Sequence, residues 1–136
     1  ILMALGTSGQ QMSVEEISRR YNVSRNHLAK VAHRLQGLGM VKATRGRGGG
    51  LSLTRPPEEI NVGEVVRAME SPGTFVECMQ PSANGCPVVR ACGLQGALTR
   101  ALQDFLRRLD QYQLSDLTPN RQRFVDLLAE GSSREA

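Results

Sequence analysis

Two capped helical segments joined by a tight turn constrain the fold more than any other feature of the chain. Ser13, three residues before Glu16, has the capping-box spacing that begins a helix, and this helix is expected to end near Asn22. Ser24 caps a second helix that is expected to end at Gly37 and Gly39. Apolar residues recur at helical spacing in both: Val14, Ile17 and Tyr21 in the first, and Leu28, Val31, Ala32, Leu35 and Leu38 in the second. Two short helices with so tight a turn predict a helix-turn-helix.

A small two-stranded wing is expected to follow. Residues 40–45 and 51–54 are short strand-like runs, and in the first run Val41 and Ala43 alternate with polar neighbours. The glycine-rich segment 46–50 joins the runs, and its glycines permit a tight turn with positive φ. Such a loop can instead cradle a nucleotide phosphate, but no Walker motif and no strand-loop-helix context accompany it. The predicted fold class is mainly α with a small β wing, a winged helix-turn-helix.

Charge is segregated along the chain. The whole chain has 17 Lys and Arg against 13 Asp and Glu, yet residues 17–57 contain no acid at all. The basic residues of this window are Arg19, Arg20, Arg25, Lys30, Arg34, Lys42, Arg45, Arg47 and Arg55. A generic basic surface is the alternative, but so long a stretch without an acid favours a surface that binds nucleic acid.

The basic window supplies side chains suited to both grooves of DNA. Asn26, Lys30 and His33 form a polar stripe at i, i+4 and i+7 of the second helix, which begins at Arg25. A stripe of this kind can face a major groove. Arg45 and Arg47 of the wing would project toward the phosphate backbone or a narrow minor groove.

All three cysteines of the chain, Cys78, Cys86 and Cys92, lie within one short segment rich in Pro, Ser, Asn and Gly. This composition favours an irregular loop, in which three thiolates can converge on one point. The odd count argues against a self-contained disulfide framework, and the lack of a Cys-x-x-Cys spacing argues against a thioredoxin-like redox pair. The segment is therefore a candidate soft-metal or redox site, and three unligated thiols in a loop are the alternative.

The choice of metal follows from the donor set. Structural zinc wants a fourth nitrogen or sulfur ligand, but the histidines, His27 and His33, lie far upstream on another expected helix. An iron–sulfur cluster tolerates an oxygen or an exogenous fourth ligand better. The step from Cys86 to Pro87 also resembles the Cys-Pro pairs of cluster sites.

Three further helices are expected. A short one runs from Asn61 or Val62 to Glu70, and the longest helix of the chain occupies about 94–117. Within the long helix, the 4-3-4-3 spacing of a coiled-coil seam is followed by Leu98, Leu102, Phe105, Leu109 and Tyr112. This seam predicts a dimer interface, and the alternative is a helix folded onto its own domain. A last helix over 120–130 places Phe124, Leu127 and Leu128 on one face, and the tail from Gly131 is expected to be disordered.

Length and composition set the outer limits. The 136 residues predict one compact domain, or a small domain with a helical appendage. The chain has no apolar run near the roughly 18 residues of a membrane helix and no secretory leader, so no membrane association and a cytoplasmic location with reduced cysteines are expected. The opening residues, 1–5, are interpreted as the back end of a helix that begins upstream. No catalytic constellation is visible, so the chain is not expected to be an enzyme.

Together, these features resemble the Rrf-two family of bacterial winged-helix regulators over essentially the whole chain. The resemblance rests on the wing sequence at 45–51, the helix start at 60–66, the three cysteines and the long helix. Within the family, residues 23–31 are most similar to the NsrR type, nitric-oxide-sensing repressors that carry an iron–sulfur cluster. The cysteine spacing also resembles the iron-responsive RirA type, whereas the IscR type has a shorter first gap and a histidine ligand that is absent here. A small thiol redox or metal-handling protein is the alternative from another class.

The resemblance implies roles for particular residues. A 4Fe-4S or 2Fe-2S cluster would be bound by Cys78, Cys86 and Cys92, with a fourth ligand that can be an acidic side chain from the partner's N-terminal helix. Glu77 is a candidate substitute for that ligand, and a solvated loop glutamate is the alternative. Double-stranded operator DNA would be contacted by Ser24, Arg25, Asn26, His27 and Lys30 in the major groove and by Arg45 and Arg47 of the wing.

The implied organisation has four parts. Residues 1–70 form the winged helix-turn-helix DNA-binding domain, and 71–93 form the cluster loop. Residues 94–118 form the dimerisation helix of a homodimer, and 119–136 form the C-terminal helix and tail. Nitric oxide would be the signal that ends repression.

Overall fold

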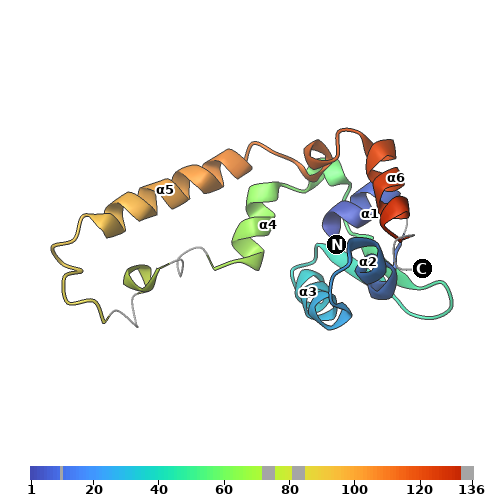
Figure 1. Ribbon diagram of the computed structural model, residues 1–136, viewed down its shortest axis with the longest axis horizontal. Coiled ribbons are helices and arrows are strands. Elements are labelled where there is room, and N and C mark those ends of the chain that lie inside the picture. Colours follow the sequence, from blue (N-terminus) through green and yellow to red (C-terminus); the bar gives the residue numbers. More distant parts are fainter. Residues whose placement is uncertain (10, 72–75, 81–84, 133–136) are drawn as a thin grey trace. The chain divides into compact units, whose positions relative to one another are not determined.

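The computed structural model describes residues 1–9, 11–71, 76–80 and 85–132 of the chain (Figure 1). The chain divides into two compact units. We call the first the head unit, which comprises Ile1–Ile60 and Gln113–Ala136, and the second the cysteine unit, which comprises Asn61–Tyr112. The functional division expected from the sequence, with boundaries at 70, 93 and 118, stays a prediction.

Three helices begin the head unit: α1 (Leu2–Ser8), α2 (Val14–Tyr21) and α3 (Arg25–Gly37). The Ser13 hydroxyl accepts the backbone N–H of Glu16 at 3.0 Å, and Asn22 ends α2 in the left-handed conformation with φ 50°. The Ser24 hydroxyl accepts the backbone N–H of His27 at 3.5 Å and so begins α3. The helix-turn-helix predicted from the two caps is therefore confirmed.

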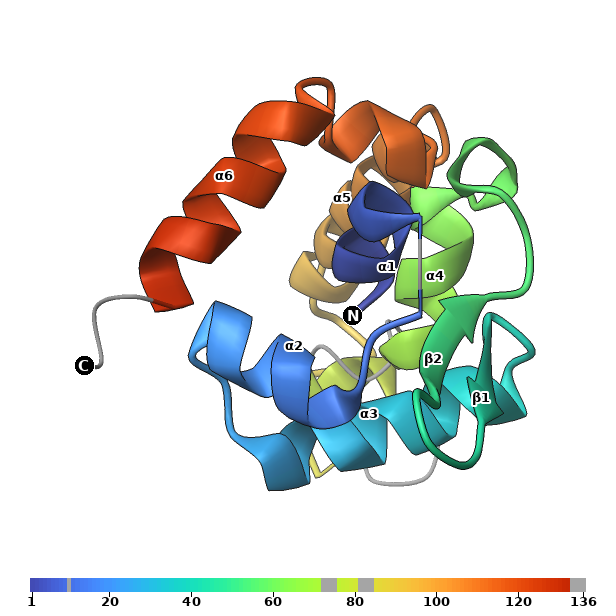
Figure 2. The ribbon, with the colours of Figure 1, turned by 90° about the vertical axis from the view of Figure 1, so that its right-hand side faces the viewer.

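The wing consists of β1 (Val41–Thr44) and β2 (Gly50–Leu53), paired antiparallel (Figure 2). The connecting loop turns through positive φ at Gly46 and Gly48, as the glycine-rich sequence predicts. Gly49 is required for a second reason, because a Cβ there would collide with the carbonyl oxygen of Thr44. The expected alternation along β1 is wrong at Ala43, which is exposed, because this part of the ribbon extends beyond the core of the head unit.

The core of the head unit forms beneath the helix-turn-helix and the base of the wing. Its largest fully buried side chains are Ile17 of α2 and Ile60, each 1% exposed. Other buried apolar side chains come from α1, α3, the wing, the segments just before α2 and β1, and the C-terminal part of the head unit: Leu2, Ala4, Leu5, Met12, Leu28, Ala32, Leu35, Met40, Val41, Leu51 and Leu114. Leu38, expected to face inward, is 42% exposed, because α3 has already ended at this C-cap residue.

The base of the wing is tied to the segment between α1 and α2. Met12 and Leu51 exchange two backbone hydrogen bonds of 3.0 and 2.8 Å, each donating its N–H to the other's carbonyl. The wing is therefore fixed at its base, while its tip carries only exposed residues from 43 to 48.

The C-terminal segment completes the head unit. Two short 3₁₀ turns, η1 (Pro57–Glu59) before the cysteine unit and η4 (Leu114–Leu117) after it, contact each other. The chain then forms α6 (Arg121–Ser132), which packs against α1 and α2. Helix α6 extends two residues beyond the predicted end at 130, so Gly131 and Ser132 of the expected tail are helical, and residues 133–136 lie outside the described part.

Aromatic packing joins α6 to α2. The rings of Tyr21 and Phe124 lie 6.5 Å apart between centroids, and burial raises the pKa of Tyr21. Val125 and Leu128 are half-buried beside Phe124, whereas Leu127, expected on the same face, is 49% exposed. Arg121 adds a hydrogen bond to α1 by donating its Nε–H to the carbonyl of Thr7.

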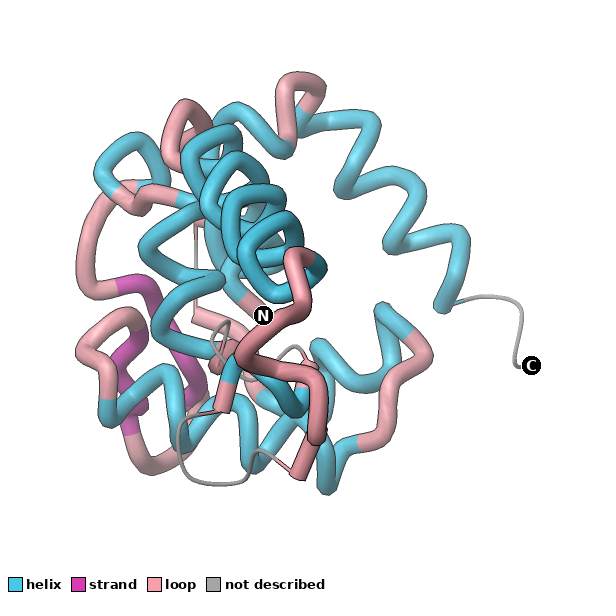
Figure 3. The backbone as a smooth tube through the Cα atoms, turned by 90° about the vertical axis from the view of Figure 1, so that its left-hand side faces the viewer, coloured by secondary structure: helices cyan, strands magenta, loops and turns pink. Residues whose placement is uncertain are grey.

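The cysteine unit consists of α4 (Val62–Met69), the 3₁₀ turn η3 (Glu77–Met79) and α5 (Leu94–Leu109), shown as helices in Figure 3. The expectation that the long helix reaches 117 is wrong, because α5 ends at Leu109. Beyond it, the Asn61 side-chain amide donates to the carbonyl of Asp110 at 2.7 Å, and the Val62 N–H donates to the carbonyl of Tyr112 at 3.0 Å. The carbonyls of Asp110 and Tyr112 therefore accept hydrogen bonds from Asn61 and Val62, and not from the backbone N–H groups of a longer helix.

A bidentate ion pair connects α4 to the residue that follows α5. The Arg67 guanidinium donates to the two carboxylate oxygens of Asp110 at 2.5 and 2.7 Å. This hydrogen bonding lowers the pKa of Asp110 and raises that of Arg67. Gly63 makes the approach possible, because a Cβ at that position would collide with the Asp110 carboxylate. Among the described helices, none is long and apolar enough to cross a membrane.

Candidate functional sites

The outer face of α3 carries most of the residues predicted to bind DNA. Leu28, Ala32 and Leu35 fix the inner face of the helix in the core of the head unit. As a result, the side chains predicted to read the major groove are exposed together along one helix: Arg25, Asn26, His27, Lys30 and His33. A polar stripe on a helix anchored from behind has the form of a recognition helix.

At the start of α3, Arg25 has a partner that sequence reasoning did not anticipate. Arg25 lies 3.5 Å from a carboxylate oxygen of Glu15 on α2, in an ion pair whose side chains are both more than two-thirds exposed. A pair this exposed contributes little stability, so Arg25 can exchange Glu15 for a phosphate or a base. Glu15 was missed because it lies just before the acid-free window. Ser24 is exposed, and its hydroxyl also serves as the helix cap.

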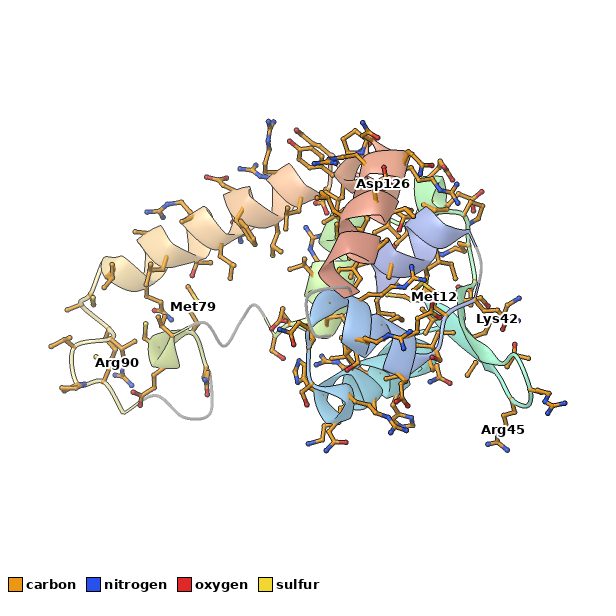
Figure 4. The ribbon with its side chains drawn as sticks, turned by 45° about the vertical axis from the view of Figure 1, so that its right-hand side comes forward. Met12, Lys42, Arg45, Met79, Arg90 and Asp126 are labelled. Atoms are coloured by element: carbon orange, nitrogen blue, oxygen red, sulfur yellow. The ribbon has the colours of Figure 1, made fainter. Side chains whose placement is uncertain are left out.

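Arg45 and Arg47 flank Gly46 in the wing loop, and both are exposed. Figure 4 shows Arg45 near the tip of the wing, pointing away from the body of the head unit, with Lys42 closer to its base. The wing therefore presents cations at its tip, where the backbone carries no bulky apolar side chain.

The cysteines occupy three different local settings in the cysteine unit. Cys78 is half-buried in the turn η3, Cys86 is half-buried in a loop, and Cys92 is exposed two residues before α5. All three are thiols in the part of the chain that the structure describes. The expected convergence is not observed, because the described residues contain no group of three or more His, Cys, Asp or Glu side chains arranged to hold a metal ion.

Hydrogen bonds instead organise the loop around the cysteines. The Glu77 carboxylate accepts the backbone N–H of Gly85 at 3.0 Å, and the Gln95 side-chain amide donates to the carbonyl of Cys78. Figure 4 labels Met79, which lies in the turn η3, and Arg90, which lies in the segment before α5. Sequence reasoning weighed Glu77 as a ligand but missed Gln95, because no local pattern pairs residues 17 positions apart.

The donor set fits an iron–sulfur cluster in its chemistry. Three thiols in one loop are the soft ligands that iron–sulfur clusters use. Cys78, Cys86 and Cys92 would hold such a group.

The predicted dimer seam on α5 is partly covered by α4. An open apolar groove of about 440 Å³ lies between the two helices, lined by Val66, Glu70, Leu98, Ala101, Leu102, Phe105 and Leu106. Leu106 is buried, but Phe105 is 54% exposed. Tyr112, the last predicted member of the seam, lies beyond the helix. The seam is therefore shorter than expected, and its open part centres on Phe105.

Comparison with known proteins identifies the family. A family model named Rrf2, described as an iron-dependent transcriptional regulator, matches residues 1–120. The chain belongs to the Rrf2 family. The resemblance to the Rrf-two family drawn from the motifs is thus confirmed, over nearly the whole length of the chain.

Within the Rrf2 family, the chain is similar to transcriptional regulators of the NsrR type. The chain is 42% identical to the HTH-type transcriptional regulator NsrR of Bacillus subtilis over 128 residues, which cover 94% of this chain and 88% of that protein. It is 40% identical to NsrR of Halalkalibacterium halodurans, with the same coverage. This Rrf2 chain is therefore an NsrR-like transcriptional regulator and not an enzyme.

Solved structures confirm the winged-helix fold of the Rrf2 family. IscR of T. potens superimposes with a TM-score of 0.67 at 22% identity, covering 88% of this chain and 78% of that one. CymR, the global cysteine regulator of B. subtilis, superimposes with a TM-score of 0.65 at 25% identity, covering 87% of each chain. The predicted fold class, mainly α with a small β wing, is confirmed.

Proposed function

We propose that this Rrf2-family protein is a homodimeric repressor whose binding to operator DNA is controlled by an iron–sulfur cluster on Cys78, Cys86 and Cys92, with nitric oxide as the signal. The observation that carries the proposal is the 42% identity to an NsrR over 94% of the chain, together with the three cysteines that the chain retains. The exposed basic helix and wing support the DNA-binding half of the proposal.

In the proposed complex, α3 of the head unit enters the major groove. Arg25, Asn26, His27 and Lys30 lie on its exposed face and would contact base edges and phosphates there. Ser24 would contact the backbone at the start of the helix, and Arg45 and Arg47 would place the wing on the phosphates or in the adjacent minor groove.

A second copy of the chain is the proposed partner along α5. Phe105 and the groove beside it leave apolar surface exposed on a helix with coiled-coil spacing. A two-fold pair of head units would match a palindromic operator, in which each α3 reads one half-site.

The cysteine loop would act as the sensor. A bound cluster would supply iron that reacts with nitric oxide. The loop leads directly into α5, so a change in the ligation of Cys92 acts on the chain two residues before the proposed dimer helix. To act as a switch, ligation must favour the DNA-binding state by more than about 1 kcal/mol.

Iron sensing is the second candidate function. The family description, iron-dependent transcriptional regulator, favours it, and so does the cysteine spacing shared with the RirA type. In an iron sensor, the same three cysteines would bind the cluster and the same surface would bind DNA. The signal would be loss of the cluster during iron limitation and not nitric oxide. IscR-type control of cluster biogenesis is the related alternative.

The signal is tested on anaerobically purified, cluster-loaded protein by its visible absorption. We expect the cluster absorbance to be lost when nitric oxide is titrated at a few equivalents per cluster, while a matched sample with an iron chelator changes slowly. Absorbance that resists nitric oxide but is lost rapidly to the chelator would favour the iron sensor. A colourless protein that cannot be loaded would contradict both.

A gel shift tests the DNA-binding half against the thiol redox alternative. We expect a specific shift on a palindromic site, with an affinity that falls as salt rises because Lys and Arg displace counterions from phosphates. A small redox or metal-handling protein with a merely basic face would show no preference for the palindrome over random DNA of the same length.

A further inference from the structure

Among the described residues, side-chain hydrogen bonds reach across the cysteine loop, and each has an end on a cysteine or on its immediate neighbour. The first joins the Glu77 carboxylate to the backbone N–H of Gly85, at 3.0 Å and eight residues apart. Glu77 immediately precedes Cys78, and Gly85 immediately precedes Cys86. The bond therefore holds the chain before the first cysteine against the chain before the second.

The second hydrogen bond connects the first cysteine to the third. The Gln95 side-chain amide donates to the backbone carbonyl of Cys78, 17 residues away, at a partly buried site. Gln95 lies in the first turn of α5, three residues after Cys92. Through Glu77 and Gln95, the stretches of backbone that carry all three thiols are tied to the start of one rigid helix.

From this arrangement we propose that Glu77 and Gln95 are positioning residues that pre-assemble the cysteine loop for ligand binding, and that Glu77 is not itself a ligand. This inference rests on the proposed function, because it assumes that the three cysteines bind a ligand through their thiolates, and it adds the residues that position them. A loop whose ends are already held near one another loses less conformational entropy when its thiolates bind. The Glu77 carboxylate is already engaged by Gly85.

The local geometry of η3 supports this role for Glu77. The turn is closed by the backbone bonds from Met79 N–H to the Val76 carbonyl and from Gln80 N–H to the Glu77 carbonyl, each 3.0 Å long. Glu77 therefore lies on a defined turn, and a Cβ added to Gly85 would lie 3.2 Å from its carboxylate oxygen. A side chain at position 85 would therefore press on the Glu77 carboxylate and shift it by a few tenths of an ångström.

The test uses full-length, metal-free, reduced protein with Cd²⁺ alone as the thiolate probe, so that it does not depend on cluster loading. Affinity is measured from the ultraviolet sulfur-to-cadmium absorption in competition with a chelator. We expect Glu77→Ala and Gln95→Ala each to weaken Cd²⁺ binding about five- to tenfold, the effect of one lost hydrogen bond. Glu77→Gln should stay within about twofold of wild type, because its amide oxygen still accepts the Gly85 N–H.

Matched controls lie on α5 of the same unit. Asp104→Ala removes an exposed carboxylate, and Gln103→Ala removes an exposed amide, so neither should change Cd²⁺ affinity. Circular dichroism of each variant confirms that the helices are retained. If Glu77→Gln binds as weakly as Glu77→Ala, Glu77 acts through its charge or as a ligand, and the inference is wrong. Wild-type affinity in both Glu77→Ala and Gln95→Ala would also overturn it.

The inference and the proposed function fail in different measurements. A wild-type protein that accepts an iron–sulfur cluster, with variants that all bind Cd²⁺ equally, contradicts pre-assembly and leaves the sensor intact. A variant series that behaves as expected with Cd²⁺, in a wild-type protein that cannot be loaded with a cluster, supports pre-assembly and contradicts the sensor.

Discussion

The head unit and the cysteine unit differ in how they bury apolar surface. Among the described residues, all but one of the buried apolar side chains belong to the head unit, and the exception is Leu106 of α5. In the cysteine unit, large apolar side chains remain exposed instead: Val88, Leu94 and Phe105 are each more than half exposed. The two units therefore rely on different sources of stability.

This difference indicates what each unit needs from outside itself. The head unit closes its own core, with Ile17 and Ile60 at the centre and α6 packed over α2. The cysteine unit is held by polar ties, such as the ion pair of Arg67 with Asp110, and leaves an apolar groove open. Under the proposed function, a second copy along α5 would cover the apolar groove and a group bound by the thiols would join the cysteine loop.

The largest expected effect is the loss of folding stability when a buried side chain in the core of the head unit is truncated. Ile17→Ala should lower the free energy of unfolding by about 2–5 kcal/mol, because it leaves a cavity at a fully buried site. Urea unfolding followed by circular dichroism measures the change. Leu127→Ala, at a half-exposed site on α6, is the control and should cost far less. Equal losses in the two variants would contradict the difference drawn between core and surface.

The next effect concerns the open surface of the cysteine unit. Phe105→Glu should weaken self-association about 30-fold or more, because a charge replaces a central apolar anchor of the proposed interface. Sedimentation velocity over a range of concentrations measures it, and helix content should stay unchanged. Gln103→Glu, an exposed position on the same helix, is the matched control. A Phe105→Glu protein that remains a dimer would place the interface elsewhere.

The wing of the head unit should contribute a smaller effect on DNA binding. Arg45→Ala is expected to weaken binding about equally on operator and random DNA, and to lower the slope of log affinity against log salt by about one. Fluorescence anisotropy at several salt concentrations measures both. Arg123→Ala, which removes an exposed cation of α6, should leave the slope unchanged. An unchanged slope in Arg45→Ala would remove the wing tip from the DNA interface.

The smallest effect is expected at the ion pair between α4 and α5. Because hydrogen bonding to Arg67 lowers the pKa of Asp110 below its ordinary value of 3.8, the stabilisation is present above that pH and is lost as pH falls through the lower value. Asp110→Asn should therefore melt slightly below wild type at pH 6, and the difference should shrink progressively as pH is lowered below 3.8. Asp104→Asn serves as the control. A difference that persists at the lower pH would contradict the ion-pair explanation.

Features encoded locally could be predicted from the sequence. The caps at Ser13 and Ser24 need only a hydroxyl and the N–H three residues later, and the wing turn needs only glycines that tolerate positive φ. For this reason the helix-turn-helix and the wing were predicted to within a residue or two. The candidate DNA-binding residues follow from the same pattern, because a helix with one buried face exposes the other.

Features that depend on contacts between distant residues could not be predicted. The end of α5 at Leu109 is set by hydrogen bonds to Asn61 and Val62, which lie some fifty residues earlier in the chain. The packing of Phe124 on Tyr21, which brings α6 into the head unit, likewise has no local signal. The tie between Gln95 and Cys78 belongs to the same class, so the internal support of the cysteine loop emerged only from the structure.

Control of DNA binding by the cysteine loop is tested most directly by operator affinity in matched anaerobic samples of cluster-loaded wild type and Cys86→Ala. Arg90→Ala, in the same loop, is the control for nonspecific damage. We predict that Cys86→Ala retains no cluster absorbance and binds the operator about 5- to 150-fold more weakly, the range of allosteric coupling between two sites. Operator affinity equal to wild type in the cluster-free variant would contradict control by the cysteine loop.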